Sequence, residues 1–220
     1  MSSKPRNPTG DAHDGITWPA RPLVGVVESL FVGLPASRYA AKTNEESISV
    51  PVLSIGDITE GRIAPLEAIP RFSLRATDLG RFRLRAGDIV VSCRGTLLKA
   101  ALVTATSSGV LASSNLITVR PDPRKYRPQL LLALFRTQAW QDTLKSRSRS
   151  STGLMQLTIK DLADLPVPMP PPELQAKLAE LVDVSERSHQ AALAVAERRR
   201  ALVDSLVTRS LLGSGHGRPQ

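Results

Sequence analysis

The longest regular pattern of apolar and polar positions lies near the C-terminal end of the chain. Apolar and small residues recur there at alternating steps of four and three, the spacing of a coiled-coil seam. The seam consists of Leu174, Leu178, Leu181, Ser185, Ser188, Ala192, Val195, Arg199, Leu202 and Leu206. Neither proline nor glycine occurs between Pro172 and Gly213, and proline suits the first position of a helix. The pattern therefore predicts one continuous helix.

A helix of this length has two interpretations. At about 1.5 Å per residue it would be roughly 55 to 60 Å long, far longer than a domain of this size needs for its own core. It either lies along the surface of its own domain or forms an arm that pairs with another helix, and its length and seam favour the arm. The residues predicted to contact a partner helix are Leu174, Leu178, Leu181, Ala192, Val195, Leu202 and Leu206.

A proline-rich segment precedes this helix. Prolines occupy five of the seven positions from Pro166 to Pro172. Because proline fixes φ and disfavours helix in the residue before it, the segment should be extended and stiff, and we expect a domain to end there. The predicted divisions are a mobile tail (1–17), a globular domain (18–170), the helical arm (171–212) and a second tail (213–220).

Short apolar segments separated by turns fill the globular part. Strands are predicted at Val50–Ile58, Ile89–Cys93, Leu98–Thr106 and Leu116–Arg120, and a helix at Pro128–Trp140. Leu23–Val32 fits either a helix or a buried strand. Residues 81–85 alternate arginine with Phe82 and Leu84, which indicates a strand with an outward comb of arginines. We expect an α+β protein: a mixed or antiparallel sheet with flanking helices, followed by one long coiled-coil helix.

Positive charge is concentrated in this globular part. The formal net charge is +9 and 41% of the residues are hydrophobic, which indicates a folded, basic protein. Residues 71–99 carry seven cationic against two acidic side chains, and residues 120–150 carry eight against two. This concentration favours nucleic acid as the partner over a merely solvated basic surface, which is the alternative.

Candidate contacts to nucleic acid lie on turns and loops within the basic segments. Cations there can bind phosphates, and polar side chains can read base edges. The side chains predicted to contact DNA are Arg38, Tyr39, Arg94, Thr96, Lys99, Asn115, Arg147 and Arg149. Asn115 has an alternative role as a turn residue that bonds the backbone.

The sequence contains no recognisable catalytic or metal-binding motif. The three histidines are scattered between two predicted tails and the long helix, so they support neither a metal site nor an acid–base pair. Cys93, the single cysteine, fits a core position better than a nucleophile, because no histidine lies near it in sequence. We expect a binding protein, not an enzyme, with no cofactor or metal. It carries neither a signal core nor a membrane-length apolar stretch, which predicts the cytoplasm.

Several short segments, taken in order, resemble one known family. They are Leu84–Ser92 (LRAGDIVVS), Arg94-Gly95-Thr96, Ser114-Asn115-Leu116-Ile117, Gly153 with Gln156, and Leu162–Pro171 before a long helix. Each segment is weak evidence alone. In this order, from about Val50 to Leu211, the chain resembles the specificity subunit of type I restriction-modification systems.

The resemblance implies a target recognition domain followed by a helical spacer. Members of that family usually carry two of each, and their spacers pair as an antiparallel coiled coil that sets the distance between two DNA half-sites. This chain has one of each, so it resembles a half-length member, and a homodimer on a palindromic split site is the simplest expectation. The family's Glu-Gln pair after the prolines is Glu173-Leu174-Gln175 here, which puts that hinge contact in question.

The resemblance also implies partners. They are double-stranded DNA, a methyltransferase subunit that supplies the active site and S-adenosylmethionine, and a nuclease-translocase subunit that can join. Two other classes stay open: a coiled-coil scaffold or adaptor in another defence complex, without its own sequence readout, and a nuclease or methylase with an unfamiliar site. Neither has a positive feature of the sequence in its support.

Overall fold

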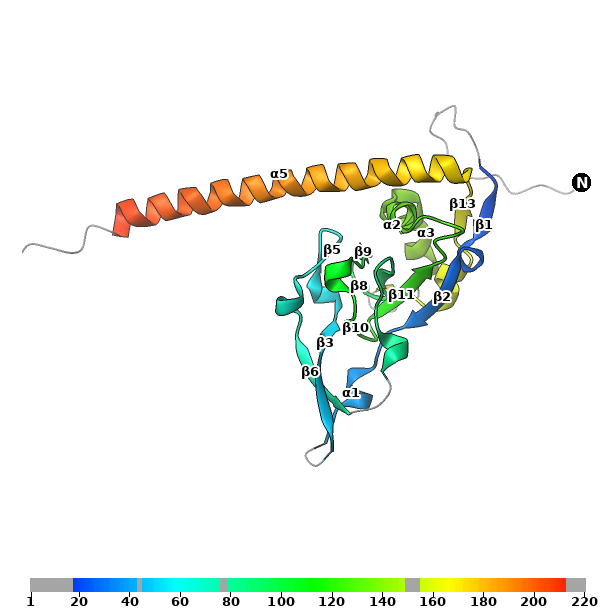
Figure 1. Cartoon of the computed structure of the whole chain (residues 1–220), viewed down its shortest axis with the longest axis horizontal. Coiled ribbons are helices and arrows are strands. Elements are labelled where there is room, and N and C mark those ends of the chain that lie inside the picture. Colours follow the sequence, from blue (N-terminus) through cyan, green and yellow to red (C-terminus); the bar gives the residue numbers. More distant parts are fainter. Residues whose placement is uncertain (1–17, 43–44, 76–78, 149–154, 213–220) are drawn as a thin grey trace, which may run out of the picture.

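The computed structural model describes residues 18–42, 45–75, 79–148 and 155–212. It consists of a globular body, residues 18–171, and one long helix that lies across an end of the body and extends far beyond it (Figure 1). Arg149 and Gly153, named above for DNA contact and for the family resemblance, fall outside the described residues, as do both predicted tails.

An antiparallel four-stranded sheet forms the centre of the body. Its strands, in spatial order, are β2 (Val27–Val32), β11 (Leu116–Pro121), β7 (Ile89–Ser92) and β9 (Ala100–Leu102). Both faces are buried, so β7 and most of β11 are continuously apolar and do not alternate. Because successive side chains point to opposite faces, Val91 and Ile117 enter one core cluster while Val90 and Leu116 enter another.

Three helices cover the first of these faces. They are α2 (Pro128–Arg136), α3 (Gln138–Arg147) and α4 (Ile159–Ala163), which bury Leu131, Phe135, Trp140, Leu144 and Leu162 against the sheet. The predicted helix at Pro128–Trp140 is thus two helices. Thr137 separates them, because it leaves the helical conformation and its hydroxyl accepts a hydrogen bond from the Trp140 amide at 3.4 Å.

A second, three-stranded sheet extends from the opposite face. It contains β10 (Leu111–Ala112), β3 (Ser47–Leu53) and β6 (Arg71–Arg75), with β10 parallel and β6 antiparallel to β3. The short α1 (Ala36–Tyr39) packs beside β6. A tight hairpin of β4 (Ile58–Thr59) and β5 (Arg62–Ile63) turns through Glu60 and Gly61, both at positive φ, as a two-residue hairpin requires.

Three sequence predictions about the body need correction. Residues 81–85 form no regular strand: Gly80–Phe82 is a 3-10 helix, although Phe82 and Leu84 are buried and the arginines exposed as expected. The return strand predicted at Leu98–Thr106 is only Ala100–Leu102, because a 3-10 turn follows. The strand predicted at Val50–Ile58 ends at Leu53, because a 3-10 turn follows at Ile55–Asp57. Of the two alternatives left open for Leu23–Val32, the strand is found, as β2 after a 3-10 turn.

The proline-rich segment is extended, as predicted, and it is paired. β13 (Pro166–Pro168) lies antiparallel to β1 (Ala20–Pro22) near the N-terminal end of the described chain. Hydrogen bonds from Leu23 N to Leu165 O, at 2.9 Å, and from Met169 N to Pro19 O, at 2.8 Å, extend this pairing. The hinge is therefore held along its length by the N-terminal strand before the long helix begins.

The long helix α5 (Pro172–Leu212) has a docked half and a free half. Gln175 and Ala179 are buried and Val182, Glu186 and Gln190 half-buried, a spacing that places one helical face on α2. Every residue from 194 to 211 is exposed. The helix thus lies on its own domain for about half of its length and extends beyond that domain for the other half.

Candidate nucleic-acid interface

A rigid cationic turn follows the central strand β7. β8 (Arg94–Gly95) pairs antiparallel with β12 (Met155–Gln156), which places Arg94 opposite Gln156. The Ser92 hydroxyl closes the turn, accepting from Lys99 N at 2.8 Å and donating to Leu97 O at 3.4 Å. Gly95 has a φ of 124°, which other residues rarely adopt. The turn therefore presents Arg94 and Thr96, both exposed, in a fixed geometry.

Leu97 at the tip of this turn was not predicted as a contact. Its side chain is 66% exposed, whereas the neighbouring Leu98 is buried in the core. Apolar side chains at such positions contact thymine methyl groups or wedge between base steps. The sequence signal was available: two successive leucines at a turn between short strands cannot both face the core.

The predicted Arg147 loop is described only as far as Ser148. Arg147 ends α3, and the chain returns as β12 at Met155, beside Gly95. The Arg147 side chain is half-buried, and its Nη1 donates to Asp161 O at 2.9 Å, which fixes the end of α3 to α4. Part of its hydrogen-bonding capacity is thus used within the protein.

Arg38 and Tyr39 belong to a second cationic group, on the β3–β6 lobe. The Tyr39 hydroxyl accepts from Arg81 Nη2 at 2.9 Å, and its ring meets Phe82 edge-on with centroids 5.9 Å apart. Arg75 Nη2 donates to Arg38 O at 2.6 Å, and its guanidinium lies 5.9 Å from the Tyr39 ring centroid. Three arginines therefore gather around one tyrosine, and the Arg38 side chain is exposed.

Lys99 and Asn115 belong to neither group. Lys99 Nζ donates to two backbone carbonyls, Ile55 O at 3.2 Å and Ile58 O at 2.7 Å. Asn115 is half-buried, and its backbone carbonyl accepts from Cys93 N at 3.0 Å. The Asn115 side chain lines a small cleft of about 320 Å³ beside α1. Both residues stay predicted contacts, and the geometry supports a structural role for Lys99.

Much of the basic surplus of the sequence is used inside the protein. The clearest cases are Arg120 with Asp88, Arg71 with Ser49, Arg83 with Gly109 O and Arg136 with Glu186. Within the described part of the chain, the side chains of Arg38, Arg85 and Arg94 form no hydrogen bond or ion pair. These three arginines are exposed and therefore available to bind phosphates.

Cys93 occupies the core position predicted for it. Burial raises the pKa of its thiol, an effect that the charge of Arg94 and a backbone hydrogen bond reduce but do not cancel. The thiol faces Ser114 O at 3.5 Å. A thiol with a raised pKa is a poor nucleophile near neutral pH.

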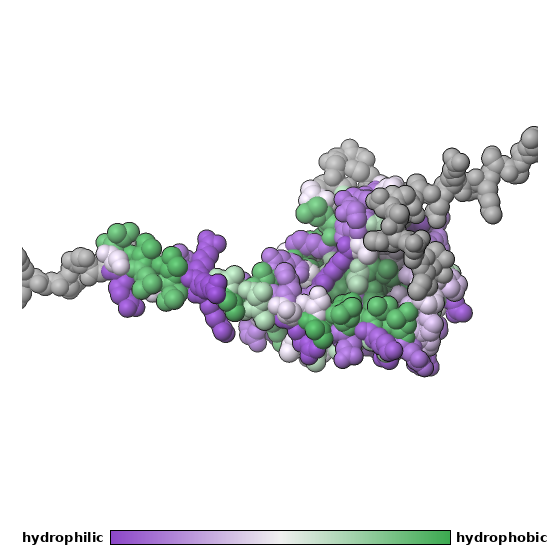
Figure 2. All heavy atoms as spheres, turned by 90° about the horizontal axis from the view of Figure 1, so that it is seen from above, coloured by the Kyte–Doolittle hydropathy of each residue, from purple (hydrophilic) through white to green (hydrophobic). Residues whose placement is uncertain are grey.

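The predicted partner-helix residues lie largely on the face of α5 that points away from α2. Leu174 is half-buried at the root, and Leu178, Leu181, Ala192, Val195, Leu202 and Leu206 are exposed. Seen from above, hydrophobic side chains gather over the body and again at the free end of the helix, with a hydrophilic band between them (Figure 2). Among the described residues, no helix is both long and apolar enough to cross a bilayer.

Known proteins share both the sequence pattern and the fold. The type I restriction enzyme MjaX specificity subunit of Methanocaldococcus jannaschii is 25% identical over 168 residues, 75% of this chain and 38% of that protein. The HsdS subunit of Thermoanaerobacter tengcongensis superimposes with a TM-score of 0.57 at 20% identity, over 92% of this chain and 51% of that one. The S subunit of a type I system from M. genitalium gives 0.54 at 16% identity, over 93% and 48%.

This chain thus spans about half the length of the solved relatives. The family model for the type I restriction modification DNA specificity domain matches residues 18–195, which include the whole described body and the docked half of α5. The resemblance read from the sequence is confirmed, and the protein belongs to the family of type I restriction-modification DNA specificity domains.

Proposed function

We propose that this protein is the sequence-reading subunit of a type I restriction-modification system and acts as a homodimer on a bipartite DNA site. The body binds one half-site through the turn at Arg94 and the group around Tyr39. A separate methyltransferase subunit brings the active site and S-adenosylmethionine, and a nuclease-translocase subunit can join. The chain itself reads DNA and catalyses nothing.

One observation supports the dimer in this proposal: the seam of α5 is regular, apolar at both of its ends, and exposed along the free half of the helix. Aliphatic side chains such as Leu181, Leu202 and Leu206 lie exposed at coiled-coil spacing, which is costly unless another helix covers them. A second copy supplies such a helix. Antiparallel pairing gives the pair two-fold symmetry, so the two half-sites are inverted repeats.

The proposal is tested by selecting bound duplexes from a random library with the purified protein. We expect enrichment of two inverted half-sites separated by a spacer of fixed length. Methyl transfer from labelled S-adenosylmethionine should require addition of the methyltransferase subunit. Retention of DNA without any sequence preference would instead identify a scaffold, and methyl transfer by the protein alone would identify an enzyme.

A further inference from the structure

The docked half of α5 is attached to α2 by polar contacts spaced along one face. Three hydrogen bonds join the two helices. Arg127 N donates to Gln175 Oε1 at 3.4 Å, Gln129 Nε2 to Asp183 Oδ2 at 3.2 Å, and Arg136 Nη1 to Glu186 Oε2 at 2.9 Å. Leu132, Ala179 and Val182 fill the space between them. The attachment thus runs from the first turn of α5 to Glu186.

Arg136 joins a third element to this contact. Its Nη2 donates to Gly61 O, in the β4–β5 hairpin, at 3.1 Å. Gly61 has a φ of 74°, and a Cβ there would collide with the Arg136 guanidinium, so glycine is needed both for the turn and for the close approach. The rigid guanidinium fork therefore ties α2, α5 and the hairpin together, which a single ammonium cannot do in the same geometry.

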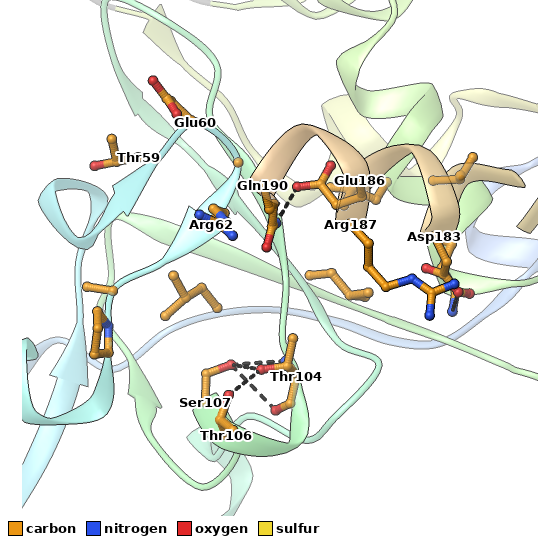
Figure 3. A pocket seen from close by; sticks show the side chains of 18 of the residues that line it. Thr59, Glu60, Arg62, Thr104, Thr106, Ser107, Asp183, Glu186, Arg187 and Gln190 are labelled. Carbon is orange, nitrogen blue, oxygen red and sulfur yellow. Dashed lines mark hydrogen bonds between the residues drawn. The ribbon is translucent and has the colours of Figure 1, made fainter. Parts of the chain in front are cut away.

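Glu186 is held in the charged form that this contact requires. Burial opposes its ionisation, but hydrogen bonds from Gln190 and Arg136 and the charges of Arg136 and Arg62 outweigh burial and lower the Glu186 pKa. Gln190 Nε2 donates to Glu186 Oε1 at 2.7 Å. Figure 3 shows Glu186 and Gln190 on α5 facing Arg62 of the hairpin across a cleft of about 1630 Å³.

The position of this contact along α5 allows it to fix the angle between the helix and the body. The helix is held at its first turn by Gln175, whose Nε2 donates to Pro170 O at 3.1 Å. Glu186 lies eleven residues further on, roughly 16 Å along the axis. Within the described chain, no hydrogen bond or ion pair links the body to α5 beyond Glu186. The Arg136 contact is therefore the outermost of the three polar contacts between α2 and α5, and the outermost contact fixes the direction of a rod.

We propose that Arg136 is a positioning residue that fixes the angle between the body and α5 and thereby sets the spacing between the two DNA half-sites. This inference rests on the proposed function, in which two bodies are joined through their α5 helices. A domain of this size is roughly 35 Å across, so a rotation of about 10° moves its far edge by about 6 Å, close to two base-pair steps. If the angle between the body and α5 varied, the distance between the two half-sites that the dimer can bind would vary as well.

The first experiment measures the angle without DNA. Spin labels at Ser73→Cys on β6 and Ser205→Cys on the free half of α5, in a Cys93→Ala background, report the distance from body to arm by pulsed electron paramagnetic resonance. Dilution with unlabelled protein removes distances between protomers. We expect a narrow distance distribution that broadens in Arg136→Ala and in Glu186→Ala, less so in Arg136→Lys, and not in Arg187→Ala.

Arg187→Ala is the matched control. Like Arg136→Ala, it removes one arginine, but from the position of α5 next to Glu186. Within the described residues Arg187 forms no ion pair. Glu186→Ala provides a second break of the contact that leaves the Arg136–Gly61 bond in place, should Arg136→Ala fold poorly. An unchanged distribution in both contact variants overturns the inference whether or not the protein binds DNA.

The second experiment measures spacing on DNA. Duplexes carry the selected half-sites with the spacer shortened or lengthened one base pair at a time. For Arg136→Ala we expect the preference for the optimal spacer over the next longer one to fall about tenfold, equivalent to about 1.4 kcal/mol. Affinity for a single half-site should not change. A preserved spacing preference in a variant with a broadened distance distribution overturns the inference and leaves the proposed function intact.

Discussion

Asp88 and Arg120 form a bidentate ion pair in the core of the body. Arg120 Nε donates to Asp88 Oδ1 at 2.8 Å and Nη2 donates to Oδ2 at 2.7 Å, and Asp88 is 1% exposed. Asp88 also accepts the backbone N–H of Arg85 at 2.7 Å. The hydrogen bond from Arg120 to Asp88 raises the pKa of Arg120, so Arg120 stays charged and paired with Asp88 in the folded protein.

Asp88→Ala should therefore destabilise the protein strongly. It leaves Arg120 and the Arg85 amide without their partner, and breaking a buried ion pair from one side costs about 3 to 5 kcal/mol. Urea denaturation measures the free energy of unfolding. Asp142→Ala, an exposed carboxylate on α3, is the control and should cost no more than about 0.5 kcal/mol. Equal stability of the two variants would show that the pair is dispensable.

Lys99 provides a test of whether a predicted DNA contact is structural. Its Nζ donates to the carbonyls of Ile55 and Ile58, at the start of the β4–β5 hairpin. We expect Lys99→Met to lower the free energy of unfolding by about 1 to 3 kcal/mol, because those carbonyls lose a charged donor. The slope of log K for DNA against log salt should stay unchanged.

The salt slope separates the two roles of Lys99. A phosphate contact would reduce its magnitude by about 0.9. Lys145→Met, at an exposed position of α3, controls for the loss of one positive charge without the loss of the two carbonyl contacts. A reduced slope together with normal stability would restore Lys99 to the DNA interface.

Elements whose residues all lie in one kind of environment, such as strands buried on both faces, could be predicted from the sequence. The strands at Ile89 and Leu116 are mostly apolar because both faces of the sheet are covered, and α5 is uninterrupted because, within it, no proline or glycine follows its first residue, Pro172. The family resemblance rested on the turn after β7 and the proline segment, both of which are fixed by backbone geometry that only a few residues permit.

The errors arose where long-range contacts override local pattern. Residues 81–85 alternate like a strand, yet only Arg83 forms a bridge, with Leu111, because the loop packs on the second sheet. The basic segments did not reveal that Arg120 and Arg136 find acidic partners far away in sequence, in the core and on α5. Charge counts alone therefore do not show which arginines are bound to acidic partners within the protein, whereas the fold does.

Arg94 and Leu97 should contribute to DNA binding in different ways. Arg94→Ala removes a phosphate contact, so it should weaken binding and reduce the salt slope by about 0.9. Leu97→Ala removes an apolar contact to base edges, so it should weaken binding about tenfold, equivalent to about 1.4 kcal/mol, with the slope unchanged.

Binding titrations at several salt concentrations measure both effects. Val24→Ala changes another exposed aliphatic side chain, outside both cationic groups, and should bind normally. If Leu97→Ala binds as tightly as the unaltered protein, the tip of the turn does not enter a groove. The same titration extends to Arg147→Ala with Arg149→Ala, for which the sequence predicts weaker binding and a flatter salt dependence.

The lowered pKa of Glu186 predicts a dependence of α5 docking on pH. A carboxyl group whose folded pKa lies below the unfolded value, about 4.3, stabilises the folded state above that value, and the contribution is lost as the pH falls through the folded pKa. Because the pair is about one-third exposed, it contributes at most about 1 kcal/mol.

Glu186→Gln tests this dependence, because the amide cannot titrate. The stability difference between the unaltered protein and Glu186→Gln should be present at pH 6 and shrink as the pH falls below about 4. Carbon-13 NMR of the Glu186 carboxyl group gives the folded pKa directly. A midpoint at or above the value for an unfolded peptide would contradict the assignment.

Self-association should depend on the free half of α5. Leu202 and Leu206 are 61% and 51% exposed in the isolated chain, so replacing both with aspartate places charges in the proposed helix pair without disturbing the body. Sedimentation should show dimers for the unaltered protein and monomers for the double variant. Ser205→Asp adds a charge on the same helical turn but outside the seam, and should stay dimeric. Monomers of the unaltered protein at high micromolar concentration, with no methyltransferase bound, would refute the two-fold arrangement.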